Sequence, residues 1–117
     1  MEEEILRLAE EFAGCRETLL ALGDETRQHM ILEMLKMHHC GGVRVGEITE
    51  KTSLSRPAVS HHIRILKDAK ILKMRREGTK NYYYFDPDGK ALSGLIQKLE
   101  HAKSITEHLP DRSGKSI

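Results

Sequence analysis

Residues 55–69 alternate between apolar and polar positions with the period of an α-helix. The apolar positions that share one face are Val59, Ile63 and Leu66. Ser55 precedes this segment as a helix N-cap residue does, and Pro57 falls in the first turn, where a missing N–H costs no hydrogen bond. The opposite face is polar and basic. The pattern predicts an amphipathic helix that ends near Ala69.

The chain after this helix changes to the pattern of β-strands. Leu72–Glu77 and Lys80–Phe85 predict two strands, and Gly78-Thr79 between them predicts a tight turn. A short helix at residues 45–51, with Ile48 as its core residue, precedes the amphipathic helix. Residues 52–55 form the turn between these two helices.

Two long helices are predicted on the N-terminal side and one on the C-terminal side. The first spans residues 2–22, and its apolar stripe comprises Ile5, Leu8, Ala9, Phe12, Leu19 and Leu22. Asp24 caps the second helix, which Cys40-Gly41-Gly42 ends. Its expected core positions are Met30, Ile31, Met34, Leu35 and His38. The last helix spans residues 90–108.

These elements predict a mostly α fold with a β-hairpin wing. The order is four helices, two strands and a last helix, which is a winged helix-turn-helix. We expect one domain over residues 1–109 and a flexible C-terminal tail over residues 110–117.

The helix and hairpin in the middle of the chain are suited to reading DNA. A helix with a cationic, hydrogen-bonding outer face fits the major groove, and a hairpin tip fits the backbone or the minor groove. The candidate DNA-binding residues are Ser55, Arg56, Ser60, His61, Arg64, Lys67, Arg76, Thr79 and Lys80.

The first and last helices are each apolar on one side, although the winged unit separates them in the sequence. We expect them to pack on each other and on a second copy of the chain, so that the homodimer reads a pseudo-palindrome. The apolar positions of the last helix have heptad-like spacing. The candidate interface residues are Ile5, Leu8, Phe12, Leu92, Leu95, Leu99 and Ala102.

Charge is distributed unevenly along the chain. The net charge is only +1, but residues 1–43 carry −5 and residues 44–82 carry +6. The basic block coincides with the winged unit, which indicates double-stranded DNA as a partner. No apolar run is long enough to cross a membrane. The start Met-Glu-Glu-Glu and the two cysteines predict a cytoplasmic protein. No catalytic motif is present, so we expect neither an enzyme nor a cofactor.

Four segments resemble the ArsR/SmtB family of bacterial transcriptional regulators. They are A-L-G-D-E-T-R at 21–27, V-G-E-I at 45–48, L-S-R-P-A-V-S-H-H-I-R-I-L-K-D-A-K-I-L at 54–72 and R-R-E-G-T-K-N-Y-Y-Y at 75–84. The resemblance implies a dimeric winged helix that represses transcription from an operator.

The resemblance also directs attention to metal sites, because many members of this family sense metals. The C-x-C positions of the thiolate sensors fall on Arg44 and Gly46. The four zinc positions of the last helix fall on Asp88, Lys90, His101 and Ser104, or in another register on Leu95, Gln97, His108 and Asp111. Either register supplies two possible ligands, whereas zinc usually takes four. The chain therefore resembles the branch without these metal sites.

Two alternative functions stay open. A metal- or thiol-responsive sensor of the same family would use His38, His39 and Cys40, with His101 and His108 as further candidate ligands, or a thiol pair of Cys15 and Cys40. The other alternative is a winged helix that binds protein and has no DNA role.

Overall fold

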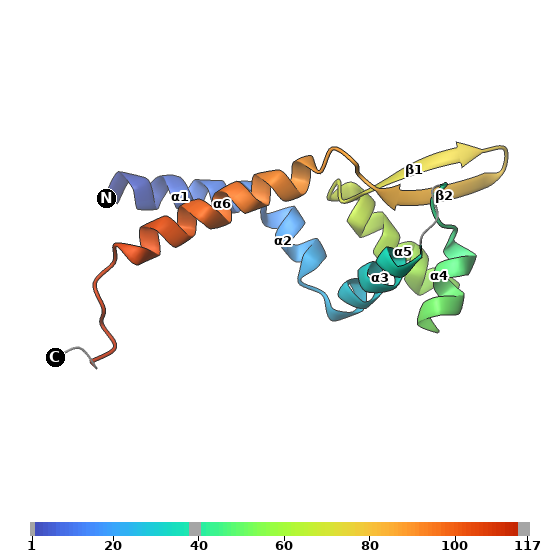
Figure 1. Cartoon of the computed structure of the whole chain (residues 1–117), viewed down its shortest axis with the longest axis horizontal. Coiled ribbons are helices and arrows are strands. Elements are labelled where there is room, and N and C mark those ends of the chain that lie inside the picture. Colours follow the sequence, from blue (N-terminus) through green and yellow to red (C-terminus); the bar gives the residue numbers. More distant parts are fainter. Residues whose placement is uncertain (1, 38–40, 115–117) are drawn as a thin grey trace.

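The computed structural model describes residues 2–37 and 41–114. Its elements are α1 (Glu2–Gly14), α2 (Arg16–Leu22), α3 (Glu25–Lys36), α4 (Val45–Thr52), α5 (Arg56–Asp68), β1 (Leu72–Glu77), β2 (Lys80–Phe85) and α6 (Lys90–Glu107) (Figure 1). The two strands pair antiparallel, with Leu72 opposite Phe85 and Glu77 opposite Lys80. This is the predicted mostly helical fold with a hairpin wing.

Helices α2 to α5 and the hairpin form a compact unit, which we call the head. Its core consists of side chains that helical spacing directs inward from three helices, together with the start of β1. The largest fully buried side chains are Met30, Ile48, Val59, Leu66 and Leu72. Burying each such side chain contributes about 1.5–3 kcal/mol, so this core fixes the relative positions of α3, α4 and α5.

Helix α5 begins and ends where the sequence predicts. The Ser55 side chain accepts a hydrogen bond from the backbone N–H of Ala58 at 3.2 Å, and Pro57 lies in the first turn. Ala69 is the C-cap residue, and Val59, Ile63 and Leu66 are buried. Because the cap, the proline and the apolar face are all local signals, the helix is well specified by its own sequence.

The first predicted helix is wrong in one respect, because residues 2–22 form two helices rather than one. Cys15 interrupts them with backbone angles φ −110° and ψ 17°. Gly14 before it has little helix propensity, so the break is cheap at this position. The break also changes which side chains are buried, because α2 packs Thr18 and Ala21 inward while no residue of α1 is fully buried.

The second predicted helix is too long. Asp24 caps α3 by accepting from the backbone N–H of Arg27 at 2.9 Å, as expected, but the helix ends at Lys36. Met37 has an extended ψ of 100°, which takes the chain out of the helix before the predicted stop. Leu35, expected in the core, is 57% exposed. His38 lies outside the described residues.

Helices α1 and α6 lie side by side and antiparallel, and they project from the head as an arm (Figure 1). Leu95 and Ile105 of α6 are buried within the protomer, and His101 Nδ1 lies 2.8 Å from Glu11 Oε1 across the two helices. The radius of gyration is 18.4 Å, whereas a compact chain of this length has about 13 Å. The arm therefore makes the protomer elongated.

The arm keeps a large amount of apolar surface uncovered. Five of its large apolar side chains are more than two-fifths exposed: Ile5, Leu6, Leu92, Ile96 and Leu99. None of the helices in the described part of the chain is long and apolar enough to cross a membrane. Contiguous exposed apolar surface of this kind marks an interaction site.

Candidate nucleic-acid interface

The outer face of α5 is the centre of the candidate interface. One side of α5 is buried through Val59, Ile63 and Leu66. The residues on the other side of the helix therefore point outward. The structure places all five predicted residues of this face in solvent: Arg56, Ser60, His61, Arg64 and Lys67. Ser55 is also exposed, but its hydroxyl already caps the helix.

The second part of the candidate interface is the tip of the wing. Gly78 has a φ of +62°, a conformation that glycine adopts without strain, and it allows the tight turn between the strands. Arg76, Thr79 and Lys80 at this tip are exposed. The Arg76 Nε donates to the Gly78 carbonyl at 3.0 Å, which orders the arginine beside the turn.

A cleft of about 400 Å³ joins these two parts. Its walls are the first turn of α4, Arg56 at the start of α5, and Thr79, Asn81 and Tyr83 of the wing. The cleft therefore brings Arg56 and Thr79, which are far apart in the sequence, to one surface. Among the predicted residues, these two line the cleft.

The wing is held by the loop between α3 and α4. Val43 and Tyr83 exchange two backbone hydrogen bonds of 2.8 Å, so the loop adds a short bridge to the edge of β2. Gly42 has a φ of +90°, and a Cβ there would lie 2.9 Å from the Tyr83 carbonyl oxygen. Only glycine fits this close approach, because any larger residue would be both strained and crowded.

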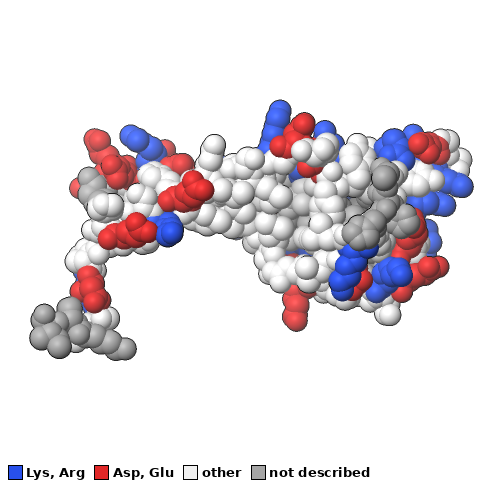
Figure 2. Space-filling view, viewed as in Figure 1, with Lys and Arg blue, Asp and Glu red and all other residues white. Residues whose placement is uncertain are grey.

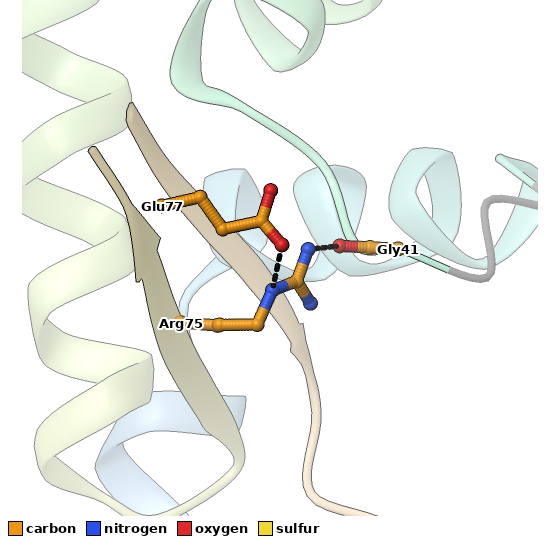
Figure 3. Close-up of polar contacts among 3 residues, drawn as sticks. All are labelled: Gly41, Arg75 and Glu77. Atoms are coloured by element: carbon orange, nitrogen blue, oxygen red, sulfur yellow. Dashed lines mark hydrogen bonds and ion pairs between the residues drawn. The ribbon is translucent and has the colours of Figure 1, made fainter. Parts of the chain in front are cut away.

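Arg75 is a second link between the wing and this loop (Figure 3). Its Nη2 donates to the Gly41 carbonyl at 2.6 Å, and its Nε lies 3.0 Å from the Glu77 carboxylate. The guanidinium also lies 4.9 Å from the centre of the Tyr82 ring. Arg75 is therefore occupied within the protein, whereas its neighbour Arg76 lies at the exposed tip.

Positive charge gathers at this end of the molecule. On the face shown in Figure 2, Lys and Arg side chains cluster over the head and wing, while acidic side chains are prominent on the arm. The distribution follows the basic block of residues 44–82. A cationic surface beside an exposed helix favours a polyanionic partner.

A buried arginine connects α3 to α5. Arg27 is only 8% exposed, and its Nη1 lies 3.2 Å from His62 Nδ1 on α5. Burial lowers the pKa of His62, the positive charges of Arg27 and His61 act in the same direction, and the Asp24 carboxylate opposes them. His62 therefore favours the neutral form, which can accept a hydrogen bond from Arg27.

The candidate metal ligands do not gather in the described part of the chain. There, no three His, Cys, Asp or Glu side chains lie close enough to share an ion. His101 contacts Glu11, and His108 Nδ1 lies 2.7 Å from the Ser104 carbonyl. Cys15 is buried, while His38, His39 and Cys40 lie outside the described residues.

The two positions at which the resemblance places a C-x-C pair are Arg44 and Gly46, and neither carries a thiol. Arg44 is the N-cap residue of α4, and Gly46 lies in its first turn. A Cβ on Gly46 would lie 3.4 Å from Arg56 Nη1. The side chains of Arg44, Glu47, Glu50 and Arg56 line this place together, so it carries both positive and negative groups.

Sequence reasoning missed three residues that organise this interface: Arg27, Val43 and Arg75. Each acts through a contact between segments far apart in the chain, which periodicity does not reveal. The one local signal was the unusual position of Arg27, three residues after the helix cap and three before the buried Met30, on the inner face of α3.

Three comparisons place the chain among known proteins. Residues 24–73 match the model of the bacterial regulatory protein family arsR. An uncharacterised helix-turn-helix transcriptional regulator of Methanocaldococcus jannaschii is 40% identical over 91 residues, which cover 77% of this chain and 99% of that protein. The arsenical resistance operon repressor of Staphylococcus aureus is 31% identical over 98 residues, covering 84% and 88% of the two chains.

The fold is also shared with a solved structure. The crystal structure of an ArsR family transcriptional regulator superimposes with a TM-score of 0.65 at 18% identity, covering 87% of this chain and 96% of that one. The matched relatives are similar over nearly their whole length, and the matched family segment contains α3, α4 and the recognition helix. The chain therefore belongs to the ArsR family of bacterial transcriptional regulators.

Proposed function

We propose that the protein is a homodimeric repressor that binds a pseudo-palindromic operator through α5 and the wing. The observation that carries the proposal is the face of α5, where five exposed polar and basic side chains lie opposite the buried Val59, Ile63 and Leu66. A helix in this position enters the major groove, and its side chains reach the base edges. The 31% identical Staphylococcus aureus relative is named a repressor, which supports the direction of regulation.

The candidate residues divide into those that contact bases and those that contact phosphates. Ser60, His61 and Arg64 lie in the middle of the exposed face and are suited to base contacts. Arg56, Lys67, Arg76, Thr79 and Lys80 flank them on the helix ends and the wing, where phosphates are contacted. Ser55 acts through the helix cap and through its backbone position at the start of α5.

The second subunit would cover the exposed side of the arm. Leu92, Ile96 and Leu99 of α6 are 42–54% exposed, and the neighbouring α1 exposes Ile5 and Leu6. A two-fold dimer would bury these side chains and place two recognition helices about 34 Å apart, one DNA turn. Leu8, Phe12 and Ala102 are half-buried at the α1–α6 contact and would support this surface. Within the described chain Leu95 already faces the protomer interior.

The proposal also covers the domain organisation of the protein, its compartment and its lack of the family's usual metal sites. Residues 1–109 act as one DNA-binding and dimerisation domain, and the protein works in the cytoplasm. Residues 115–117 of the expected tail lie outside the described residues. Arg44 and Gly46 at the C-x-C positions, together with the occupied His101 and His108, support a member of the branch without the family's usual metal sites.

Selection from a pool of random duplexes tests the proposed function directly. We expect the purified protein to enrich a pseudo-palindrome whose two half-sites lie about 10 base pairs apart, because the dimer presents two identical helices. A scrambled duplex of the same composition is the control. The proposal would be contradicted if the selection enriched no sequence. It would also be contradicted if added salt weakened binding to the selected and the scrambled duplex by the same factor.

A second expectation concerns metals. Zinc, cadmium or arsenite titrated into the protein–operator complex should not release the DNA at one equivalent per subunit, because neither family site has four ligands here. Fluorescence anisotropy of a labelled operator follows the release. Stoichiometric release would contradict this expectation, and His38, His39 and Cys40 would then be the first residues to replace.

A further inference from the structure

The C-terminal end of α2 depends on side chains of α3 for its hydrogen bonds. The last four carbonyls of a helix have no partner within it. In α2, the Leu19 carbonyl accepts from the Gly23 backbone N–H at 2.9 Å. The other three accept from side chains: Leu20 from Arg27 Nη2 at 2.9 Å, Ala21 from Arg27 Nε at 2.8 Å, and Leu22 from Gln28 Nε2 at 2.7 Å.

Arg27 uses its remaining terminal nitrogen on the recognition helix. Its Nη1 lies 3.2 Å from His62 Nδ1. Arginine has no acceptor, so Nη1 donates, and His62 must accept with an unprotonated Nδ1. One buried guanidinium therefore ties two carbonyls of α2 to a side chain of α5.

This contact lies between the two parts of the molecule that a dimer must align. Helix α2 continues from α1 of the arm after the break at Cys15, and it also packs against α6. Helix α5 carries the reading face. Helix α5 also packs directly against α2, and its most extensive contacts are with α4 and β1 of the head. Arg27 is thus a polar link from the arm side of the head to the reading helix.

We propose that Arg27 is a positioning residue that sets, through His62, the angle of the recognition helix relative to the arm and thereby the half-site spacing that the dimer accepts. The inference rests on the proposed function, a dimer reading two half-sites. Small changes in the angle of α5 are doubled by the two-fold axis, so the distance between the two reading faces depends strongly on this contact.

The contact should also respond to pH. The charged or titratable groups acting on His62 are Asp24 at the α3 cap, Arg27 on α3 and His61 on α5 itself. Burial lowers the pKa of His62 below the ordinary value of 6.5. The hydrogen bond from Arg27 to neutral His62 therefore stabilises the fold fully above pH 6.5. This stabilisation is lost as the pH falls towards the lowered pKa of His62 in the folded protein. Protonation puts a proton on Nδ1 and removes the acceptor.

Selectivity for half-site spacing tests this role, because general loss of folded protein lowers binding to all operators alike. We measure the affinity for the selected operator and for the same operator with one base pair inserted at its centre. His62→Leu removes the acceptor while keeping an apolar side chain of similar size, and we expect the affinity ratio to fall by about fivefold or more.

Two matched variants control the test. His62→Asn places an amide oxygen near the position of Nδ1, and we expect it to keep the ratio within about twofold. Gln28→Ala removes an equivalent hydrogen bond to α2 without contacting α5, and it should also keep the ratio. An unchanged ratio in folded His62→Leu, or an equal fall in Gln28→Ala, would overturn the inference.

The pH comparison decides the question if His62→Leu does not fold. As the pH is lowered from about 7.5 until His62 protonates, which the NMR signal of its imidazole reports, the wild-type ratio should fall, whereas that of His62→Asn should stay constant, because asparagine does not titrate. Contacts within a half-site are the same on both operators and cancel in the ratio. Parallel pH profiles would overturn the inference. Failure to dimerise or to select an operator would instead contradict the proposed function.

Discussion

Replacing Leu99 by glutamate should separate the two subunits and remove operator binding at concentrations where the wild type binds. Leu99 is 45% exposed on the protomer and continues the uncovered α6 surface of Leu92 and Ile96. Burial of each leucine is worth about 1.5–3 kcal/mol, and the two-fold axis counts it twice. We therefore expect the dimer dissociation constant to rise by about a hundredfold or more, measured by sedimentation equilibrium.

Two other variants separate dimerisation from folding. Gln97→Glu places a carboxylate two residues away on the exposed side of the same helix, and it should leave the dimer intact. Leu95 is only 7% exposed and is buried inside the protomer, so Leu95→Glu should unfold the arm as well as break the dimer. A well-folded wild-type monomer at micromolar concentration would contradict the assembly.

Replacing Arg64 by alanine should make the protein less selective. Arg64 is exposed on α5 one turn from Ser60, and its planar guanidinium can donate two hydrogen bonds to guanine O6 and N7. We expect a loss of about 1–3 kcal/mol on the operator and much less on random DNA. Binding isotherms on operator and scrambled duplex measure both. Ser60→Ala should show a smaller loss that is also confined to the operator.

Lys80→Ala is the matched control, because it removes a cation from the wing tip rather than from the reading helix. It should weaken binding to both duplexes alike and reduce the salt slope by about one. If Arg64→Ala lowers operator and random affinity equally, the reading face is assigned to the wrong residues, even for a dimer that binds DNA.

The recognition helix and the wing could be predicted from the sequence because their signals are local. A capping serine, a first-turn proline and an apolar face define α5, and alternation around Gly78-Thr79 defines the strands. The observed strand bounds, Leu72–Glu77 and Lys80–Phe85, are the predicted ones. The exposed side of α5 then follows from its buried side.

The remaining features depend on contacts between distant segments. Nothing near Leu35 indicates that it is exposed while Met34 is buried, since both fit a helical stripe and only the packing of α4 decides between them. The break at Cys15 separates the arm from the head, and its position depends on packing between distant segments as well as on Gly14. Buried Arg27 runs against the general exposure of arginine, and its partners lie on two other helices.

The mass and affinity of the protein–operator complex test the central claim most directly. Sedimentation equilibrium of the wild type with its selected operator should give two chains per duplex. Isotherms at near-physiological salt should give an affinity about a thousandfold or more above that for scrambled DNA. One chain per duplex, or equal affinity for the two duplexes, would contradict a dimer that reads sequence through α5.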